Sequence, residues 1–115
     1  MIGGVGVAIS TRNRRPVFDR ILDKWRRYLP EGSMLVVVDD ASKTPLTGGD
    51  TVENGSLYRL ISHKDRLGVA MTKNDGIAAL MEAGCEHLFL ADDDVGPASA
   101  DWWIPYVESP ELHLS

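Results

Sequence analysis

The stretch HLFLADDD, residues 87–94, joins a short apolar run directly to three consecutive carboxylates. An uninterrupted apolar run of this length is typical of a strand that is buried on both faces, as in a parallel sheet. Three adjacent carboxylates repel one another at neutral pH unless water, a hydrogen-bond donor or a cation compensates their charge. We therefore expect residues 87–91 to form an interior strand, with Asp92, Asp93 and Asp94 as a polar cluster at its carboxyl end.

Three further segments share this apolar character, and two helical patterns lie between the strands. Residues 5–10 and 34–38 are rich in β-branched residues, and residues 57–62 form a shorter run. Apolar residues at three- and four-residue spacing predict helices over 15–29 and 69–83. Strands that alternate with helices predict a three-layer α/β/α, Rossmann-like fold with a mostly parallel sheet.

The details of the helices and connections follow from local signals. The second helix is expected to end at Gly84, in the C′ position. We expect its core face to consist of Ala70, Ile77, Ala78 and Met81. Residues 43–56 lack periodicity and are rich in Thr, Pro, Gly, Asp and Asn, which predicts a loop. Residues 102–107 are expected to form a short helical or extended segment.

Composition limits the classes of protein that need to be considered. The chain has 115 residues, the size of one domain spanning residues 1–115. A net charge of -5 argues against nonspecific nucleic-acid binding, which requires a basic face. Cys85 is the only cysteine, which excludes an internal disulfide and fits a reducing compartment, so we expect a cytoplasmic protein. The apolar residues 1–10 are too short for a signal peptide or a membrane span.

Polar side chains follow three of the predicted strands, at the edge of a parallel sheet where ligands usually bind. Thr11 and Arg12 follow the first strand, Asp40 the second, and the acidic triplet the last. Each cluster also has a simpler interpretation. Thr11 and Arg12 are alternatively a helix cap, Asp40 with Ser42 a local Asx turn, and the triplet a solvated turn.

The acidic triplet has the chemistry of a divalent-cation site. In an extended segment Asp92 and Asp94 face one way and Asp93 the other. Carboxylate oxygens suit Mg²⁺ or Mn²⁺, which complete their coordination with water and substrate phosphates. His63 and His87 have no Cys or His partner in the sequence pattern and are not assigned to a metal.

The remaining chemically distinctive residues admit two interpretations each. Arg66 and Lys64, before the second helix, suit either a phosphate contact or an exposed surface. Trp102 and Trp103 suit the core or, beside an acidic site, the face of a sugar ring.

Taken in order, four segments resemble the N-terminal part of a family 2 glycosyltransferase with the GT-A fold. The matching segments are VAISTRNR (7–14), VVVDDAS (36–42), GVA with NDGI (68–70 and 74–77), and LFLADDD (88–94). They cover nearly the whole chain. The resemblance implies a site for a nucleotide-diphosphate sugar, with a UDP-sugar favoured, and transfer of the sugar to an unknown acceptor.

The resemblance also implies roles for the candidate residues. Thr11 and Arg12 would border the nucleoside, and Asp40 would hydrogen-bond its base. Asp92 or Asp93 would contact the ribose or the water shell of a Mn²⁺ or Mg²⁺ ion, for which Asp94, with Asp92, would be the ligand. Arg66 would help to orient the nucleotide.

Two departures from the family pattern matter for function. The usual aromatic residue of the first motif is Arg12 here, so a charge replaces base stacking. The acceptor-binding half is missing, and residues 101–111 contain no match to the acid that serves as the base in this commonly inverting family. We therefore expect a truncated enzyme or a noncatalytic nucleotide-sugar-binding remnant. A Toprim-like metal-dependent phosphoryl-transfer domain is a third alternative, although its glutamate after the first strand has no counterpart here.

Overall fold

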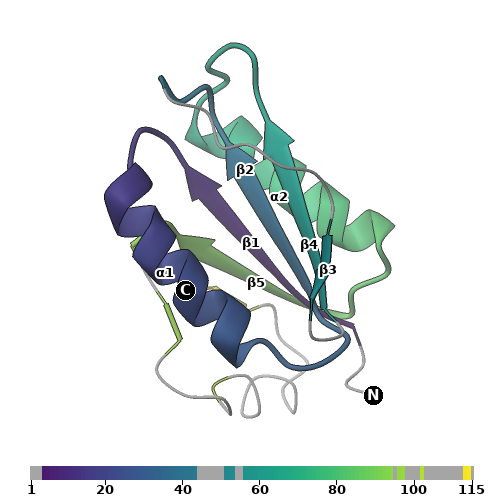
Figure 1. Ribbon diagram of the computed structural model, residues 1–115. Coiled ribbons are helices and arrows are strands. Elements are labelled where there is room, and N and C mark those ends of the chain that lie inside the picture. The colour runs from purple at the N-terminus through teal and green to yellow at the C-terminus, as the bar shows by residue number, and fades with distance from the viewer. Residues whose placement is uncertain are drawn as a thin grey trace.

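The computed structural model describes residues 4–43, 51–53, 56–94, 96–97, 102 and 113–114, which form a six-stranded sheet between two helices (Figure 1). Two helices and six strands follow one another in the order β1 (Val5–Thr11), α1 (Arg15–Tyr28), β2 (Met34–Asp39), β3 (Thr51–Glu53), β4 (Ser56–Ser62), α2 (Val69–Glu82), β5 (His87–Asp92) and β6 (His113–Leu114). The predicted α/β/α class is confirmed.

The strands lie in the order β3-β4-β2-β1-β5-β6, and only β3 runs antiparallel to its neighbour. The loop predicted for residues 43–56 is therefore wrong in part, because Thr51–Glu53 pairs with β4. This strand has three residues and lies at the sheet edge, so its pairing depends on β4 and leaves no periodicity in the sequence. Each of the four strands that the sequence does predict is one residue longer in the structure than expected.

Alternation along the central strands separates two hydrophobic cores. The α1 side consists of Val5, Val7, Ile9, Phe18, Trp25, Leu35, Val37, Tyr58, Phe89 and Ala91. The α2 side consists of Ala8, Met34, Val36, Val38, Ala79 and Leu80. Figure 1 shows the two helices on opposite faces of the sheet. Both faces of β1 and β2 are buried, which explains why their sequences are continuously apolar.

Helix α1 follows the predicted pattern. Pro16 lies in the first turn, where its missing N–H is not needed, and Arg26 and Arg27 lie in the last turn, where positive charge is favourable. Phe18 and Trp25 are buried against the sheet. Trp102 covers this layer, with its ring 5.2 Å from Trp25 and 4.9 Å from Phe89.

The predicted core face of α2 is wrong. The buried residues are Thr72, Gly76, Ala79 and Leu80, whereas Ala70 and Ala78 are exposed and Met81 is 65% exposed. Hydrophobicity did not identify the face because Val69, Met71 and Met81 are apolar and point outward. The close approach depends on Gly76, where a Cβ atom would lie 2.9 Å from Cβ of Ala8.

The end of α2 follows the prediction for Gly84. This residue has a φ of 82°, its N–H bonds to the Met81 carbonyl, and the next N–H, of Cys85, bonds to the Leu80 carbonyl. This pair of bonds is a Schellman motif, which needs a residue in the left-handed region. Neither described helix is long and apolar enough to cross a membrane. Of the predicted segment 102–107, only Trp102 belongs to the described residues.

Candidate functional site

The parallel register brings the predicted polar clusters to one edge of the sheet. Thr11 is paired with Asp39 on β2, and Ser10 is paired with Asp92 on β5. Asp39 is in turn paired with Ser62 at the end of β4. The carboxyl ends of these four strands therefore lie side by side, at the place where ligands bind in open α/β sheets.

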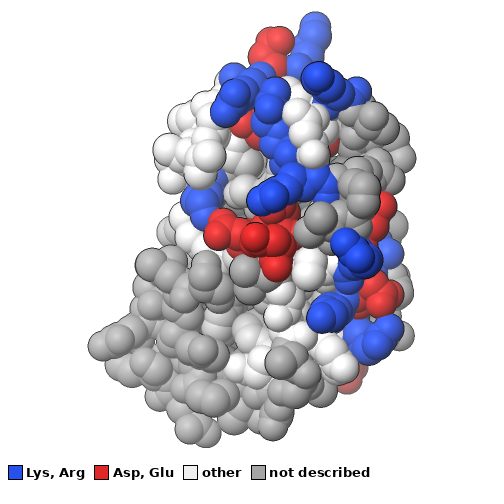
Figure 2. Space-filling model, turned by 90° about the vertical axis from the view of Figure 1, so that its left-hand side faces the viewer, with Lys and Arg blue, Asp and Glu red and all other residues white. Residues whose placement is uncertain are grey.

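A cleft of about 320 Å³ lies at this edge. Its lining includes six residues singled out from the sequence: Thr11, Arg12, Asp40, Arg66, Asp92 and Asp93. Sequence reasoning did not identify the other four lining residues, which are Ser10, Val69, Thr72 and Lys73. Asp94 is exposed and does not line the cleft. Figure 2 shows acidic side chains gathered in one patch, with lysine and arginine side chains beside it.

The three carboxylates of the triplet have different surroundings. Asp93 is buried, accepts a hydrogen bond of 3.0 Å from the Thr11 hydroxyl, and lies 3.3 Å from Nε of Arg14. Asp92 is 62% exposed and accepts a hydrogen bond of 3.3 Å from Nζ of Lys73. Asp94 is exposed. The alternation expected for an extended segment is wrong, because Asp93 and Asp94 lie in a turn after β5: Asp92 and Asp93 both line the cleft, and Asp94 does not. Asp92 and Asp94 are nevertheless the two exposed side chains of the triplet.

Thr11 does not cap helix α1, so this alternative is wrong. The N-cap is Arg14, without a side-chain cap bond, and Thr11 ends β1 with its hydroxyl directed to Asp93. The Asx turn also involves a different residue: Ser42 donates through its N–H and its hydroxyl to Asp39 rather than to Asp40.

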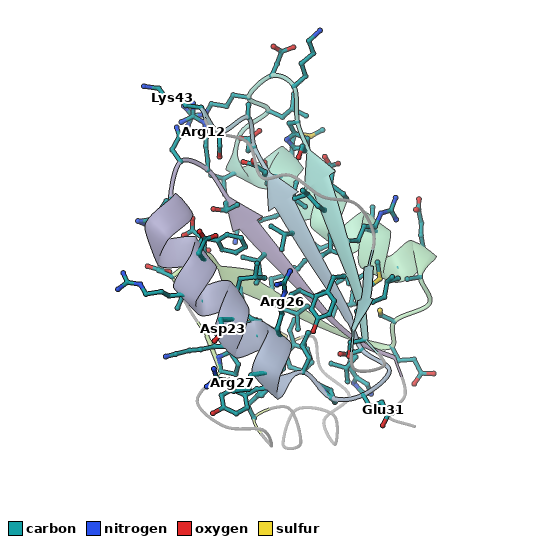
Figure 3. All side chains as sticks on the ribbon, viewed as in Figure 1. Arg12, Asp23, Arg26, Arg27, Glu31 and Lys43 are labelled. Carbon is teal, nitrogen blue, oxygen red and sulfur yellow. The ribbon has the colours of Figure 1, made fainter. Side chains whose placement is uncertain are left out.

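The loops after β1 and β2 are joined to each other by Asn13. Its N–H donates to the Ser42 hydroxyl at 2.8 Å, and its side-chain oxygen accepts from the N–H of Lys43 at 2.7 Å. Asn13 has a φ of 55°, a left-handed conformation that Asn tolerates better than most residues. Figure 3 shows Arg12 and Lys43 together at this end of the sheet, far from Glu31 at the other end.

Asp40 is buried in a cage of donors. Its Oδ1 accepts from the Leu67 N–H at 2.8 Å and lies 2.9 Å from Nδ1 of His63, and its Oδ2 accepts from the Gly68 N–H at 3.0 Å. Burial raises the pKa of Asp40, but these hydrogen bonds and the charge of His63 outweigh it and lower that pKa to about 2. Asp40 is therefore a fixed carboxylate in the wall of the cleft.

From its sequence pattern His63 was not assigned to a metal, and no other role was predicted for it. Nε2 of its ring lies 2.6 Å from Oδ2 of Asp75 on α2, so the ring bridges two carboxylates. The hydrogen bond to Asp40 raises the pKa of His63, burial opposes it, and the hydrogen bond to Asp75 and both negative charges add to the increase. Its position directly after β4, beside Asp40 in the expected alignment of strand ends, was the signal that could have identified it.

Trp102 packs in the core, which is one of the two positions expected for it. Besides its ring contacts, its Nε1 donates to the Tyr28 carbonyl at 2.9 Å. Trp103 lies outside the described residues. Cys85 is partly buried, and burial raises the pKa of its thiol, in line with a structural role.

The fit of a divalent ion depends on Asp92 and Asp94. Across the described part of the chain, no group of three or more His, Cys, Asp or Glu side chains is arranged to hold a metal ion. Mg²⁺ is usually held by one or two carboxylates together with water and substrate phosphates rather than by a protein cage. Asp92 lines the cleft together with the cations Arg12, Arg66 and Lys73, and the exposed Asp94 follows two residues later. These two carboxylates therefore fit a site that a bound diphosphate completes.

Comparison with known proteins relates the chain to a solved structure. No protein-family model matches the chain, and no curated protein matches it in sequence. Among solved structures, the chain is similar to the mannosyltransferase PcManGT from Pyrobaculum calidifontis, in complex with GDP-Man and Mn²⁺, with a TM-score of 0.65 and 22% identity. The match covers 92% of this chain but 32% of that chain. At this identity the likeness shows the fold alone, a Rossmann-like α/β fold shared with part of that mannosyltransferase.

Proposed function

We propose that this chain is the donor-binding part of a glycosyltransferase, which binds a nucleoside-diphosphate sugar and transfers the sugar to an acceptor. The observation that carries the proposal is the cleft, in which Thr11, Arg12, Asp40, Arg66, Asp92 and Asp93 converge from separate segments. Fold alone does not establish activity, so the argument rests on this arrangement.

The charges of the cleft suit the parts of such a donor. The positive charge for a diphosphate comes from Arg12, Arg66 and Lys73. The planar guanidinium group of arginine can donate two parallel hydrogen bonds to phosphate oxygens. Asp40 is ionised, and its Oδ2, which receives the Gly68 N–H, has a second lone pair for an N–H group of the base. Thr11 and Asp93, joined by their hydrogen bond, fix the floor near the ribose.

Asp94 and Asp92 are the proposed ligands of Mn²⁺ or Mg²⁺. When bound, such an ion neutralises negative charge on the departing diphosphate. Asp93 is a poor ligand because Thr11 and Arg14 already use its oxygens. Lys73 holds Asp92 at the edge of the cleft and compensates part of its charge.

A binding experiment decides which nucleobase the donor carries. The family resemblance implies a UDP-sugar, whereas PcManGT was solved with GDP-Man. The inverting stereochemistry implied by the resemblance needs a carboxylate base, and we assign that role to none of the described residues.

Calorimetry tests the donor site directly. UDP-glucose, GDP-mannose, UDP and GDP are titrated into the protein with and without Mn²⁺ or Mg²⁺. We expect one base to be preferred and binding to require the metal. Asp94→Ala should lose the metal-dependent binding. Glu86→Ala, which replaces an exposed acid beyond the opposite end of β5, should bind as the wild type does. If no nucleotide binds in the presence of metal, the proposal is wrong.

A second experiment separates an enzyme from a noncatalytic remnant. Donor hydrolysis is followed by release of the nucleoside diphosphate from whichever nucleotide sugar binds. Turnover that is lost in Asp94→Ala supports a transferase, and tight binding without turnover supports a binding remnant. Binding of metal and inorganic diphosphate alone, without any base preference, would favour the Toprim-like alternative.

A further inference from the structure

We propose that His63 is a positioning residue, which clamps the Asp40 carboxylate and the 63–68 segment against α2, so that nucleotide binding requires a protonated His63 ring. The inference deepens the proposed function and rests on it for the nucleotide-binding part only. The clamp itself is a property of the unliganded protein and is tested without any ligand.

The His63 ring lies between two carboxylates. Nδ1 of His63 lies 2.9 Å from Oδ1 of Asp40, and Nε2 lies 2.6 Å from Oδ2 of Asp75. A neutral imidazole has one N–H, so one of its nitrogens would direct a lone pair at a carboxylate oxygen. Both contacts are hydrogen bonds together only when the ring carries two protons or a carboxylate carries one. The N–H groups of Leu67 and Gly68 stabilise the ionised form of Asp40 independently of the ring, so the imidazolium is the form that fits.

Burial makes this arrangement strong. The side chains of His63 and Asp40 are each 7% exposed, and that of Asp75 is 37% exposed. Charge-assisted hydrogen bonds shielded from water are stronger than those on the surface. The charged groups that act on the ring come from two elements, Asp40 from the end of β2 and Asp75 from α2. The backbone of His63 is also fixed, because its N–H donates to the Asp39 carbonyl at 2.9 Å.

The clamp connects to the cleft through Asp40 and the segment that follows His63. Asp40 receives the N–H groups of Leu67 and Gly68, and it lines the cleft together with Arg66. Gly68 has a φ of 92° and precedes α2, so this turn depends on its anchor as well as on glycine. Loss of the proton on His63 places a lone pair opposite one carboxylate. That contact then opens, and either Asp40 or the link to α2 is released.

The first test uses the unliganded protein. Nitrogen chemical shifts of the His63 ring are recorded by NMR between pH 5.5 and 8.5, together with the amide resonances of Leu67 and Gly68. We expect both ring nitrogens to be protonated at neutral pH and the two amides to titrate with the same midpoint as the ring. A ring with one proton at neutral pH and an ordinary midpoint, or amides that do not follow the ring, would overturn the clamp.

The second test measures binding against pH. UDP-glucose and GDP-mannose with Mg²⁺ are the probes, because a diphosphate esterified at both ends has no proton to lose in this range. Affinity for the probe that binds should fall about tenfold as the pH rises through the His63 midpoint, the effect of losing one charge-assisted hydrogen bond. His63→Gln should bind weakly at every pH, without this pH dependence. Asp75→Asn should shift the midpoint of the ring and of binding together to lower pH.

A matched control variant and the ligand-free titration distinguish failure of the His63 inference from failure of the proposed function. His87→Gln removes a histidine in the first position of β5, at the other end of the sheet, and should leave the pH profile unchanged. His63→Gln with wild-type affinity and wild-type pH dependence would overturn the inference. If neither probe binds the wild type at any pH, the proposed function fails. The ring and amide titrations still decide whether His63 holds Asp40.

Discussion

The hydroxyl of Thr11 donates to the Asp93 carboxylate at 3.0 Å, which joins two residues that are 82 positions apart in the sequence. The bond links the carboxyl ends of β1 and β5, and both side chains are nearly inaccessible to water. It divides the acidic triplet into one structural carboxylate and two accessible ones. The proposed donor site depends on this division.

Removal of the Thr11 hydroxyl should destabilise the protein. Thr11→Val keeps the shape of the side chain but leaves a buried charged acceptor with one donor fewer, at a cost of about 1 to 3 kcal/mol. Thr11→Ser keeps the donor and loses one methyl group, about 1 kcal/mol. Urea denaturation followed by circular dichroism compares the two. A Thr11→Val protein that is as stable as Thr11→Ser would contradict a structural role for the bond.

Stability should fall in acid because of Asp40. The pKa of this carboxyl is lowered to about 2 in the folded protein, so its contribution is present above the ordinary value near 3.8 and is lost as the pH falls through the folded pKa. The shift corresponds to about 2 kcal/mol. Urea midpoints measured from pH 5 to pH 2 should decline more steeply in the wild type than in Asp40→Asn. Parallel curves for the two proteins would show that Asp40 is not stabilised in this way.

Lys73 should matter for binding rather than for folding. Its ion pair with Asp92 joins side chains that are 34% and 62% exposed, and pairs of this kind contribute about 0 to 1 kcal/mol. Lys73→Gln should therefore unfold at nearly the wild-type urea concentration but bind nucleotide sugars several-fold more weakly, because a cation of the cleft wall is lost. Lys24→Gln on α1 is the matched control. Equal binding by the two variants would exclude a role for Lys73 at the diphosphate.

A side chain at position 76 should disturb the packing of α2. Alanine normally stabilises a helix relative to glycine by about 1 kcal/mol. Here its Cβ would lie 2.9 Å from Cβ of Ala8, and overpacking of this kind costs about 1 to 3 kcal/mol. Gly76→Ala should therefore be less stable than the wild type in urea denaturation. Ala8→Gly should be less harmful in the Gly76→Ala background than in the wild type, and strictly additive effects would argue against the contact.

Much of the fold was predictable because both central strands are buried on two faces. Continuous apolar runs such as residues 34–38 identify interior strands, and Pro16 with Pro30 bounds the first helix. The edge strand β3 and the buried face of α2 were not predictable in the same way. Edge pairing is supplied by β4, and the face of α2 is selected by the space at Gly76 rather than by hydrophobicity.

The candidate site was likewise predictable only in part. The sequence by itself determined which residues follow the strands, and the parallel alternation of strands and helices required Thr11, Asp40 and the triplet to meet at one edge. Only the tertiary structure decided what each of them contacts. Asp93 turns inward to Thr11, and Asp40 is held by His63, which Asp75 holds in turn. Such contacts join residues from different elements, and their distances depend on strand register and on how closely α2 packs, neither of which local patterns specify.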